Sequence, residues 1–207
     1  MQNKNEQSEF VELKLMDVVQ QFGEEEVKEI LSNFSCPRNL DVEKFIREDA
    51  IAFSKKRQSI TYLVFSLQEM KLAGFYSIAI KPVAIPAAAI SKSLAKRAAR
   101  IGSFDETTQT YSTAMYLIAQ LGKNSQYGEA ESLGGRELLA FATAKISELS
   151  HLAGGTLQFL ECEDVEFLKH FYEENNFAWF GARIAEREDG DGHGHGHLLH
   201  QYIRKID

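Results

Sequence analysis

The chain contains few cysteines and no long apolar run. Cys36 and Cys162 are the two cysteines among 207 residues, and their wide separation has no metal-like spacing. We therefore expect reduced thiols in a cytoplasmic protein, without a disulfide framework. No apolar run approaches the roughly 20 residues that span a bilayer. Residues 1–9 also lack the apolar segment of a secretory signal, so we expect no association with membranes.

Net positive charge is also absent. The chain has 23 lysines and arginines against 30 aspartates and glutamates, a formal net charge of −7. Neutralising nucleic-acid phosphates needs a net basic face, so this balance argues against broad, nonspecific nucleic-acid binding. A local basic patch is present nonetheless, because Lys92, Lys96, Arg97 and Arg100 share one predicted helix. This patch is either a solvated helix face or a contact for phosphates.

Length and composition suit one ordinary globular domain. Hydrophobic residues make up 44% of the chain and charged residues 26%, which is enough apolar surface for a core. We expect a single domain over 1–207. Within it, residues 1–33 form an N-terminal helical extension, and residues 188–197 form a Gly/His-rich hairpin loop.

The spacing of apolar residues divides the chain into strands and helices. Gly23 is expected to break the first helix, Asn39 or Asp41 to cap the second, and Pro82 and Pro86 to end a strand. The expected strands cover 10–15 (where a helix is the alternative), 60–67, 72–81, 111–122, 156–162, 177–187 and 198–206, and the expected helices cover 16–32, 41–56, 86–100, 133–150 and 164–175. Residues 102–109 are expected to form a polar loop.

This order of elements predicts an α/β (α+β) fold. Strand–helix–strand units in the second half imply right-handed crossovers and some parallel pairing. We therefore expect a mixed, mostly antiparallel central sheet of six to seven strands, flanked by helices.

A glycine pair lies at the start of the predicted helix 133–150. Backbone N–H groups at a helix N-terminus are unpaired and attract anions, and Gly134 and Gly135 carry no Cβ that would keep a phosphate away. The alternative is a tight turn without a ligand. In its strand–turn–helix context, the pair predicts a pyrophosphate site.

The segment 133–139 resembles the coenzyme A loop of the GCN5-related N-acetyltransferases. That loop reads [Q/R]-x-x-G-x-[G/A] and is followed two residues later by an apolar pair. Gly135 takes the last glycine position, and Leu138 and Leu139 take the apolar pair. Leu133 and Ala130 depart from the pattern, standing where the family has its earlier glycine and its Gln/Arg.

A second segment carries the same resemblance. Residues 34–46 are similar to the F-x-C-x-x-x-L-x-x-F-[LI] pattern of a subfamily that includes tRNA-acetylating toxins and uncharacterised mobile-element acetyltransferases. The resemblance as a whole covers 34–187. It implies an acetyl-CoA co-substrate and a GNAT-like sheet.

The resemblance also implies coenzyme contacts. The strand 116–123 is similar to the family's fourth strand, whose main chain pairs with the pantetheine arm. A backbone N–H near Leu121 would then donate to the thioester carbonyl. A shifted alignment would let Tyr127 and Gly128 share the binding. The coenzyme-binding residues implied are Leu121, Gly122, Lys123, Leu133, Gly134, Gly135 and Arg136.

Tyr172 is the side chain that the resemblance places near the coenzyme sulfur, in a Phe-Tyr-x-x-x-x-Phe stretch that ends at Phe177. A phenol of pKa about 10 can protonate a thiolate whose conjugate acid has a pKa of about 8.5, once the group is partly buried. The alternative is an ordinary aromatic on a helix face. The family's asparagine seven residues earlier is replaced by Val165.

The acceptor amine must lose a proton before it attacks, since an alkylammonium has a pKa of about 10.4. Glu161 and Glu163 end a predicted strand and are the candidate bases. Each is alternatively a solvated acid at a helix start. Cys162 is not expected to be a nucleophile, because no histidine is placed in sequence to activate it.

We therefore expect transfer of an acetyl group from acetyl-CoA to a primary amine, by direct attack in a ternary complex. One alternative is toxin-type acetylation of aminoacyl-tRNA, in which the 92–100 helix contacts phosphates and a small antitoxin protein is a partner. Another is a non-enzymatic module of the same fold that has lost coenzyme binding. The expected partners are a coenzyme A thioester and an unidentified amine, and a homodimer is an option.

The histidines near the C-terminus alternate with glycine. His193, His195 and His197 would lie on one face of an extended strand, with His200 nearby, an arrangement able to bind zinc or nickel weakly. The alternative is a turn between the last two strands. We expect no metal cofactor.

Overall fold

The computed structural model describes residues 9–68, 70–126, 133–185 and 196–206. The chain divides into two compact units, one formed by Met1–Ile78 with Gln120–Ala142 and the other by Ala79–Ala119 with Thr143–Asp207. The sequence prediction of one domain over 1–207 stays a prediction.

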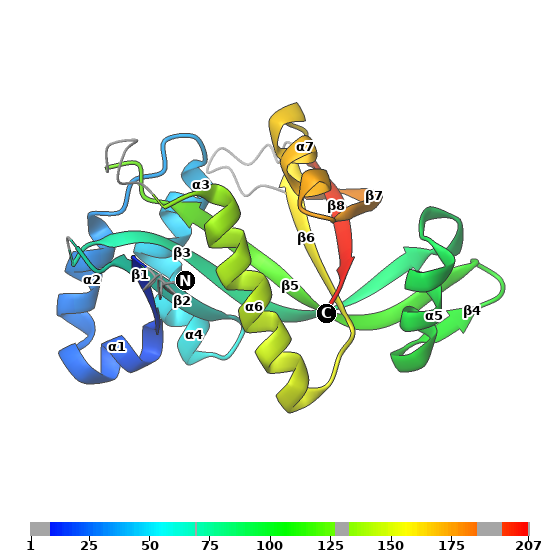
Figure 1. Ribbon diagram of the computed structural model, residues 1–207, viewed down its shortest axis with the longest axis horizontal. Helices are drawn as coiled ribbons and strands as arrows, with labels where there is room; N and C mark the ends of the chain where they lie inside the picture. The colour runs from blue at the N-terminus through cyan, green and yellow to red at the C-terminus, as the bar shows by residue number, and fades with distance from the viewer. Residues whose placement is uncertain (1–8, 69, 127–132, 186–195, 207) are drawn as a thin grey trace, which may run out of the picture. The chain divides into compact units, whose positions relative to one another are not determined.

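The strands form a mixed sheet in the hydrogen-bonded order β1-β2-β3-β5-β6-β8-β7, with β4 paired to β5 (Figure 1). β5 and β6 pair in parallel, whereas β1 with β2, β2 with β3, β4 with β5, β6 with β8 and β7 with β8 pair antiparallel, which confirms the predicted mixed, mostly antiparallel sheet. The described part of the chain has eight strands rather than six or seven. They are β1 Phe10–Lys14, β2 Ile60–Ser66, β3 Leu72–Pro86, β4 Ser103–Asp105, β5 Thr110–Lys123, β6 Leu157–Glu163, β7 Ala178–Ala185 and β8 His197–Lys205.

The first unit contains an antiparallel meander of β1, β2 and the start of β3, with registers Phe10↔Ser66 and Ile60↔Ile78. Its helical part follows β1 (Figure 1). The helical segments are α1 Leu15–Phe22, α2 Glu24–Ser32, α3 Leu40–Lys44, a π-helical turn Phe45–Asp49 and α4 Ala50–Lys55. The helix residues Leu15 and Leu31, and Phe34 from the segment after α2, are buried with the sheet residues Leu63 and Phe75 in one core cluster.

Local signals set these helix boundaries. Gly23 separates α1 from α2 with a φ of 93°, a conformation that favours glycine, as the sequence predicted. Asn39 caps α3, because its side-chain oxygen accepts the Val42 N–H at 3.1 Å. The predicted helix 41–56 is interrupted by the π-helical turn, where Phe45 and Ile46 are buried.

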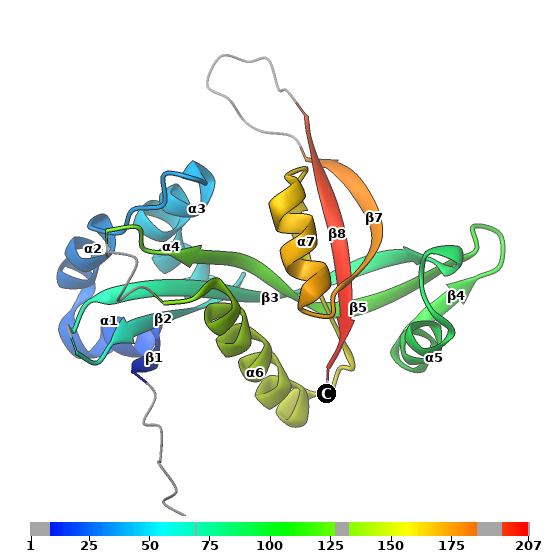
Figure 2. The same cartoon turned by 45° about the horizontal axis from the view of Figure 1, so that its top comes forward.

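The second unit is built on β6 and β8. β6 runs parallel to β5 at Tyr116↔Gln158 and antiparallel to β8 at Leu157↔Lys205. α7 Glu166–Glu174 belongs to this unit and contacts β6 and β7 (Figure 2). α5 Lys92–Ile101 belongs to it as well. The core cluster of this unit contains Ile85, Met115, Leu157, Phe159, Phe180 and Ile203.

α6 Gly135–Ala153 begins in the first unit and ends in the second. It begins at Gly135, the second glycine of the pair, two residues after the predicted start at 133. Gly154 and Gly155 end it with φ values of 80° and 102°. At the second of these, an added Cβ would lie 2.7 Å from the Tyr116 ring, so glycine is required there for space as well as for conformation.

Two predicted boundaries are wrong. Pro82 does not end the second hairpin strand, because β3 continues to Pro86. β2 pairs with β3 only as far as Ile78, so the N–H that proline lacks is not needed for that ladder. Of the predicted helix 86–100, Ala87–Ala89 form a 3₁₀ turn, and α5 begins only at Lys92, where the Ser91 side chain accepts the Leu94 N–H at 3.3 Å. The predicted polar loop 102–109 contains the short strand β4.

Among the described residues, no helix is both long and apolar enough to cross a bilayer. The expected Gly/His-rich hairpin loop lies almost wholly outside the described residues, since the structure resumes at Gly196 and β8 begins at His197. His193 and His195 therefore lie outside the description, and the weak metal site predicted there stays untested.

Candidate active site

The residues expected to bind coenzyme lie in the first unit, at the end of β5 and the start of α6. Leu121, Gly122 and Lys123 are the last residues of β5. The carbonyl of Gly134 accepts the Leu138 N–H at 2.9 Å, which makes Gly134 the residue before the first helical turn. The N–H groups that follow it point along the helix axis without a partner inside the helix, as anion binding requires.

Leu133 is a core residue in this structure. Only 1% of its surface is exposed. It packs where β3 lacks a side chain: a Cβ added to Gly74 would lie 2.9 Å from Leu133 Cδ2 and 3.0 Å from the Gly122 carbonyl oxygen. The leucine that departs from the family pattern therefore anchors the segment before α6. Main chain that a phosphate could approach without meeting a side chain starts at Gly134.

Gly122 is required by packing. A Cβ at this position would lie 2.6 Å from Val42 Cγ1 and 2.8 Å from Phe75 Cε1. The last residues of β5 are thereby pressed against α3 and β3 within the first unit. From sequence, Gly122 was expected only to contact the coenzyme. In the structure it also lets Val42 and Phe75, which are distant in sequence, pack closely against β5.

Asn124 is a structural residue of this region that the sequence analysis missed. Its side-chain oxygen accepts the N–H groups of Ser35 at 3.1 Å and Gln126 at 3.2 Å. Its amide nitrogen donates to the Leu72 carbonyl at 2.9 Å. One buried side chain thus joins the end of β5 to the start of β3 and to the segment before α3. An asparagine directly after a strand was the only available signal.

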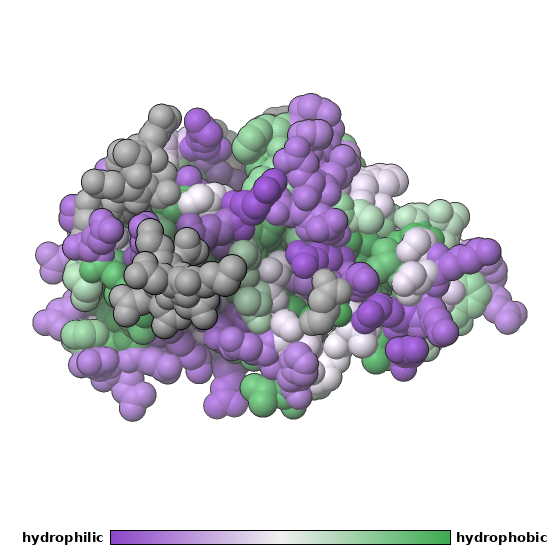
Figure 3. All heavy atoms as spheres, viewed as in Figure 1, coloured by the Kyte–Doolittle hydropathy of each residue, from purple (hydrophilic) through white to green (hydrophobic). Residues whose placement is uncertain are grey.

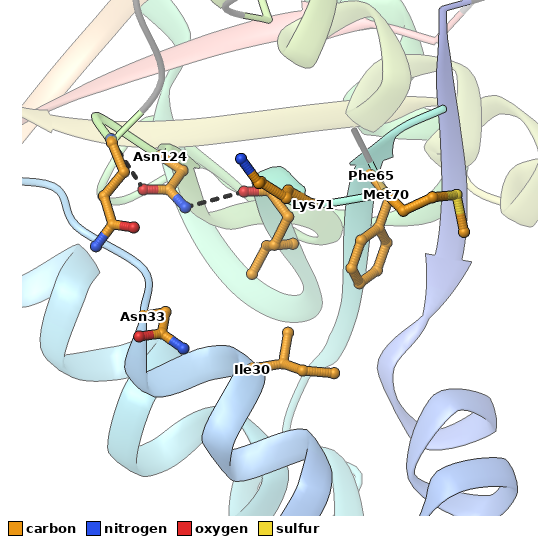
Figure 4. Close-up of a pocket in the computed structure, with 8 residues that line it drawn as sticks. Ile30, Asn33, Phe65, Met70, Lys71 and Asn124 are labelled. Carbon is orange, nitrogen blue, oxygen red and sulfur yellow. Dashed lines mark hydrogen bonds between the residues drawn. The ribbon is translucent and has the colours of Figure 1, made fainter. Parts of the chain in front are cut away.

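A hollow of about 350 Å³ lies beside Asn124 (Figure 4). Its lining combines apolar side chains with amides and one lysine, from α2, the β2–β3 connection and the residues after β5. The lining residues are Ile30, Asn33, Phe65, Met70, Lys71, Leu72, Asn124 and Gln126. The hydrogen bonds of Asn124 to Ser35, Gln126 and Leu72 hold its side chain in place, so this residue shapes the hollow.

The three predicted catalytic side chains lie in the second unit. Tyr172, on α7, is only 8% exposed. Its ring makes edge contacts with Phe171 at 5.1 Å and Phe177 at 6.1 Å, and a tilted contact with Tyr202 at 6.1 Å between centroids. Burial raises the pKa of the Tyr172 phenol well above its usual range, with a smaller contribution from the nearby Cys162 thiol. The phenol is therefore protonated at every physiological pH.

No described residue hydrogen-bonds the Tyr172 hydroxyl. The ring is buried, but the hydroxyl oxygen is not among the fully buried polar atoms that lack a partner, so it keeps some accessible surface. Three aromatic neighbours fix the position of the Tyr172 ring, and its hydroxyl makes no hydrogen bond within the described chain. The hydroxyl can therefore donate to a ligand atom. Chemically, the group can act as a proton donor and not as a base.

Cys162, on β6, is buried and lies near Tyr172 of α7. Burial raises the pKa of its thiol to about 11. Among the smaller effects of neighbouring charges, Lys169 lowers the pKa, and Asp164 and Glu163 raise it. The nucleophilic form of a cysteine is the thiolate, which is scarce at neutral pH under these conditions. The structure thus gives Cys162 a packing role.

Glu161 is engaged in an ion pair. Arg183 donates to both of its carboxylate oxygens, from Nε at 2.7 Å and Nη2 at 2.6 Å, and Gln201 donates at 2.8 Å. Burial pushes the pKa of the Glu161 carboxyl upward, but these hydrogen bonds and the charge of Arg183 outweigh burial and hold the pKa below its usual range. A carboxylate stabilised in this way is a weaker proton acceptor.

Glu163, the other candidate base, is half-exposed at the end of β6 and lies opposite Leu199 of β8. Its carbonyl oxygen accepts the Val165 N–H at 2.7 Å, in the turn that leads to α7. Within the described part of the chain, its carboxylate has no bidentate partner comparable to Arg183. Of the two glutamates, Glu163 is therefore the better placed to accept a proton.

His200 belongs to a polar chain across the second unit. Trp179 Nε1 donates to His200 Nδ1 at 3.1 Å, and His200 Nε2 lies 3.2 Å from an Asp164 oxygen. Asp164 also binds Lys169 at 2.5 Å. Both ring nitrogens of His200 are thus occupied. In the described ranges, no group of three or more potential ligand side chains could hold a metal ion.

Comparison with solved structures identifies the fold. The chain has the fold of the GCN5-related N-acetyltransferases. Its sequence matches no family model and no curated protein. The assignment of the fold therefore rests on the arrangement of the elements, and structures of AtaT and KacT are among those that share it.

AtaT complexed with acetyl-methionyl-tRNAfMet is 16% identical to the chain, covers 92% of it and 93% of its own length, and has a TM-score of 0.59. A tyrosine-to-phenylalanine mutant of KacT is 14% identical over 96% of both chains, with a TM-score of 0.62. AtaTR bound with acetyl-CoA is 14% identical over 97% of this chain and 95% of that chain, with a TM-score of 0.54. At these identities the likeness establishes the fold alone.

Proposed function

We propose that the protein is an acetyl-CoA-dependent N-acetyltransferase that acts on a primary amine in the cytoplasm. The observation that carries the proposal is Tyr172, whose buried ring has an unpaired hydroxyl on the α7 helix of a GNAT fold. Burial keeps this phenol in its protonated form, which is the form that a proton donor must have, and the same burial makes it a weaker acid than an exposed tyrosine. Transfer of an acyl group from a thioester needs a proton donor, because its leaving group is a thiolate.

Coenzyme binding is assigned to main-chain groups of the first unit. In this proposal the residues 121–123 pair with the pantetheine arm, and an N–H near Leu121 donates to the thioester oxygen. The N–H groups at the start of α6, together with the Cβ-free Gly134 and Gly135, bind the pyrophosphate. AtaTR and an AtaT mutant were solved with acetyl-CoA, which supports the same co-substrate here.

The reaction needs no covalent enzyme intermediate. The neutral amine nitrogen attacks the thioester carbon, and the tetrahedral intermediate collapses as the carbon–sulfur bond breaks. The thiolate takes a proton from Tyr172, and the amine's proton passes to Glu163, directly or through water. Glu161 is the secondary candidate for that role, since its ion pair with Arg183 weakens it as a base.

A second candidate function concerns the acceptor. The AtaT structure named above contains acetyl-methionyl-tRNAfMet, and other neighbours contain an antitoxin segment or DNA. The basic residues of α5 provide this chain with a local surface for phosphates despite its negative charge. Together these observations favour the amino group of an aminoacyl-tRNA as the acceptor, with a small antitoxin protein as partner. A homodimer stays a prediction.

The test is a thiol-release assay with acetyl-CoA against polyamines, peptides, aminoglycosides and charged tRNA. Thiol release that depends on one acceptor class confirms the activity and identifies the substrate. Calorimetry with coenzyme A separates an enzyme lacking its acceptor from a module that has lost coenzyme binding, because only the enzyme produces heat of binding. Absence of both signals would refute the proposal.

A further inference from the structure

The outer face of α5 carries a line of positive charge. Lys92, Lys96 and Arg100 are spaced four residues apart, so they lie on one side of the helix, and all three are exposed. The opposite side packs into the core of the second unit through Leu94 and Ala98. α5 contains no acidic residue.

These three cations have no carboxylate partner among the described residues. Other lysines of the protein differ in this respect, since Lys28 and Lys55 both bind Glu24. Arg97 differs too, because its Nη1 donates to the Ile206 carbonyl at 3.5 Å. The basic patch of four predicted from sequence is therefore an outward line of three, with Arg97 held by the structure.

An exposed aromatic ring lies at the end of this helix. Phe104 of β4 is 41% exposed, and its ring contacts Tyr111 of β5 at 4.7 Å between centroids. Gly102 joins α5 to β4 tightly, since an added Cβ would lie 2.3 Å from the Ser112 carbonyl oxygen. In the space-filling view, hydrophilic, near-neutral and hydrophobic surface lie side by side over α5 and β4 (Figure 3). Helix and ring are thus held in a fixed arrangement.

We propose that Lys92, Lys96, Arg100 and Phe104 form a contact surface for single-stranded RNA. The three cations bind successive phosphates, and the Phe104 ring stacks on an unpaired base, the combination that single-strand binding uses. The choice of RNA rests on the proposed acetylation of an RNA-linked amine. An acidic peptide would use the cations and leave the ring without a role.

The size of the surface limits what it binds. Asp105 and Glu106 follow Phe104 directly, and the Asp105 carboxylate accepts the N–H groups of Thr107 and Thr108 at the hairpin turn. These negative charges repel phosphates, so the surface binds only a few nucleotides, on the α5 side. With three phosphates neutralised, the logarithm of the binding constant falls with the logarithm of salt concentration with a slope of roughly −2.

The experiment measures fluorescence anisotropy of a labelled 12-nucleotide oligouridylate added to the full chain, over a range of salt concentrations. Lys92→Gln/Lys96→Gln is compared with Lys28→Gln/Lys55→Gln, which removes the same charge where it is already paired. We expect the first variant to bind at least tenfold more weakly and to reduce the salt slope by roughly 1.4. The second should bind within twofold of the wild type. Equal loss in both variants would overturn the proposal.

The aromatic contact is tested by Phe104→Leu against Phe167→Leu, an exposed phenylalanine on α7. Phe104→Leu should weaken RNA binding about fivefold or more without changing the salt slope, because stacking involves no counterion release. A polyglutamate peptide is the competing ligand. If it binds as tightly as the RNA through the same lysines, and Phe104→Leu has no effect, the surface is for an acidic partner and the proposal is wrong.

Acetyl-CoA calorimetry and thiol release with a small amine accompany each variant, and circular dichroism confirms folding. These signals should be unchanged in all four variants. RNA binding without any acetyl-CoA binding would sink the proposed function and leave the surface standing. Acetyl transfer without RNA binding would do the reverse.

Discussion

At the scale of single residues, the second unit contains two polar groups in opposite situations. The Tyr172 ring is buried and its hydroxyl has no described partner, so the phenol stays protonated and its hydroxyl is free to contact a ligand. Glu161 is also largely buried, but Arg183 and Gln201 saturate its oxygens. The first arrangement suits chemistry, and the second suits structure.

Tyr172→Phe should lower turnover at least about tenfold, the lower range for loss of a general acid, with little change in coenzyme affinity. The reason is that the substitution removes only the proton donor. Steady-state thiol release and calorimetry measure the two quantities. Tyr116→Phe is the matched control: it removes a phenol that donates to the Gly154 carbonyl at 2.8 Å and should cost about 1 kcal/mol of stability without slowing turnover. An unchanged rate for Tyr172→Phe would remove Tyr172 from the mechanism.

The pKa of Glu161 also predicts how stability depends on pH. A carboxyl whose pKa is lowered by folding stabilises the native state above its unfolded pKa of about 4.3, and this contribution is lost as pH falls through the folded pKa. Arg183→Gln should lower the free energy of unfolding by about 1–3 kcal/mol at pH 7, and the difference should shrink below about pH 4.

Urea denaturation at pH 7, 5 and 3.5 measures this difference. Lys28→Gln, which breaks only an exposed ion pair with Glu24 and Glu25, should change stability by at most about 1 kcal/mol. A deficit of Arg183→Gln that is the same at every pH would show that packing, not charge, makes the contribution.

At the scale of elements, the end of β5 and the start of α6 contain glycines with different purposes. Gly122 is surrounded by core side chains, whereas the nearest atom to a Cβ added at Gly134 is 3.8 Å away. The first glycine is needed by the fold. The second leaves room in front of the main chain, where a phosphate would bind.

Gly122→Ala should therefore destabilise the protein by about 1–3 kcal/mol through overpacking. Gly134→Ala should change stability by less than about 0.5 kcal/mol, because its added Cβ would make only an ordinary van der Waals contact, with Glu137 Cβ at 3.8 Å. It should nonetheless weaken coenzyme A binding by about 1 kcal/mol, or roughly fivefold, since a methyl group would displace the phosphate from one N–H. Thermal unfolding and calorimetry of both variants check the pair. Strong destabilisation by Gly134→Ala would show that this glycine, too, is structural.

Element boundaries show how far local patterns reach. The alanine-rich run 86–100 satisfies helical periodicity throughout, yet α5 begins at Lys92, where Ser91 supplies a capping oxygen. β3 passes through Pro82 because its partner β2 has already ended. In both cases the pattern indicated the type of element correctly. The boundary depended on hydrogen bonding: a capping oxygen fixed the start of α5, and the end of the β2 ladder allowed β3 to continue through Pro82.

At the scale of the whole molecule, ligand binding should appear as stability. Acetyl-CoA at one hundred times its dissociation constant should raise the free energy of unfolding by about 2.7 kcal/mol, because it binds only the folded chain. Differential scanning fluorimetry with acetyl-CoA, and with adenine as control, measures the shift in thermal midpoint. A module without coenzyme binding would show none.

The sequence alone determined the order and type of nearly all elements, the glycine pair at the start of α6 and the position of Tyr172 on a helix, because these follow from residues a few positions apart. Only the tertiary structure showed that Leu133 fills the space beside Gly74, that Arg183 occupies Glu161 and that Arg97 is held by Ile206, a residue 109 positions away. Such pairings join distant segments, and no local periodicity encodes which side chain will meet which. Folding thereby decided which of the predicted polar groups are committed to structure and which are left for chemistry.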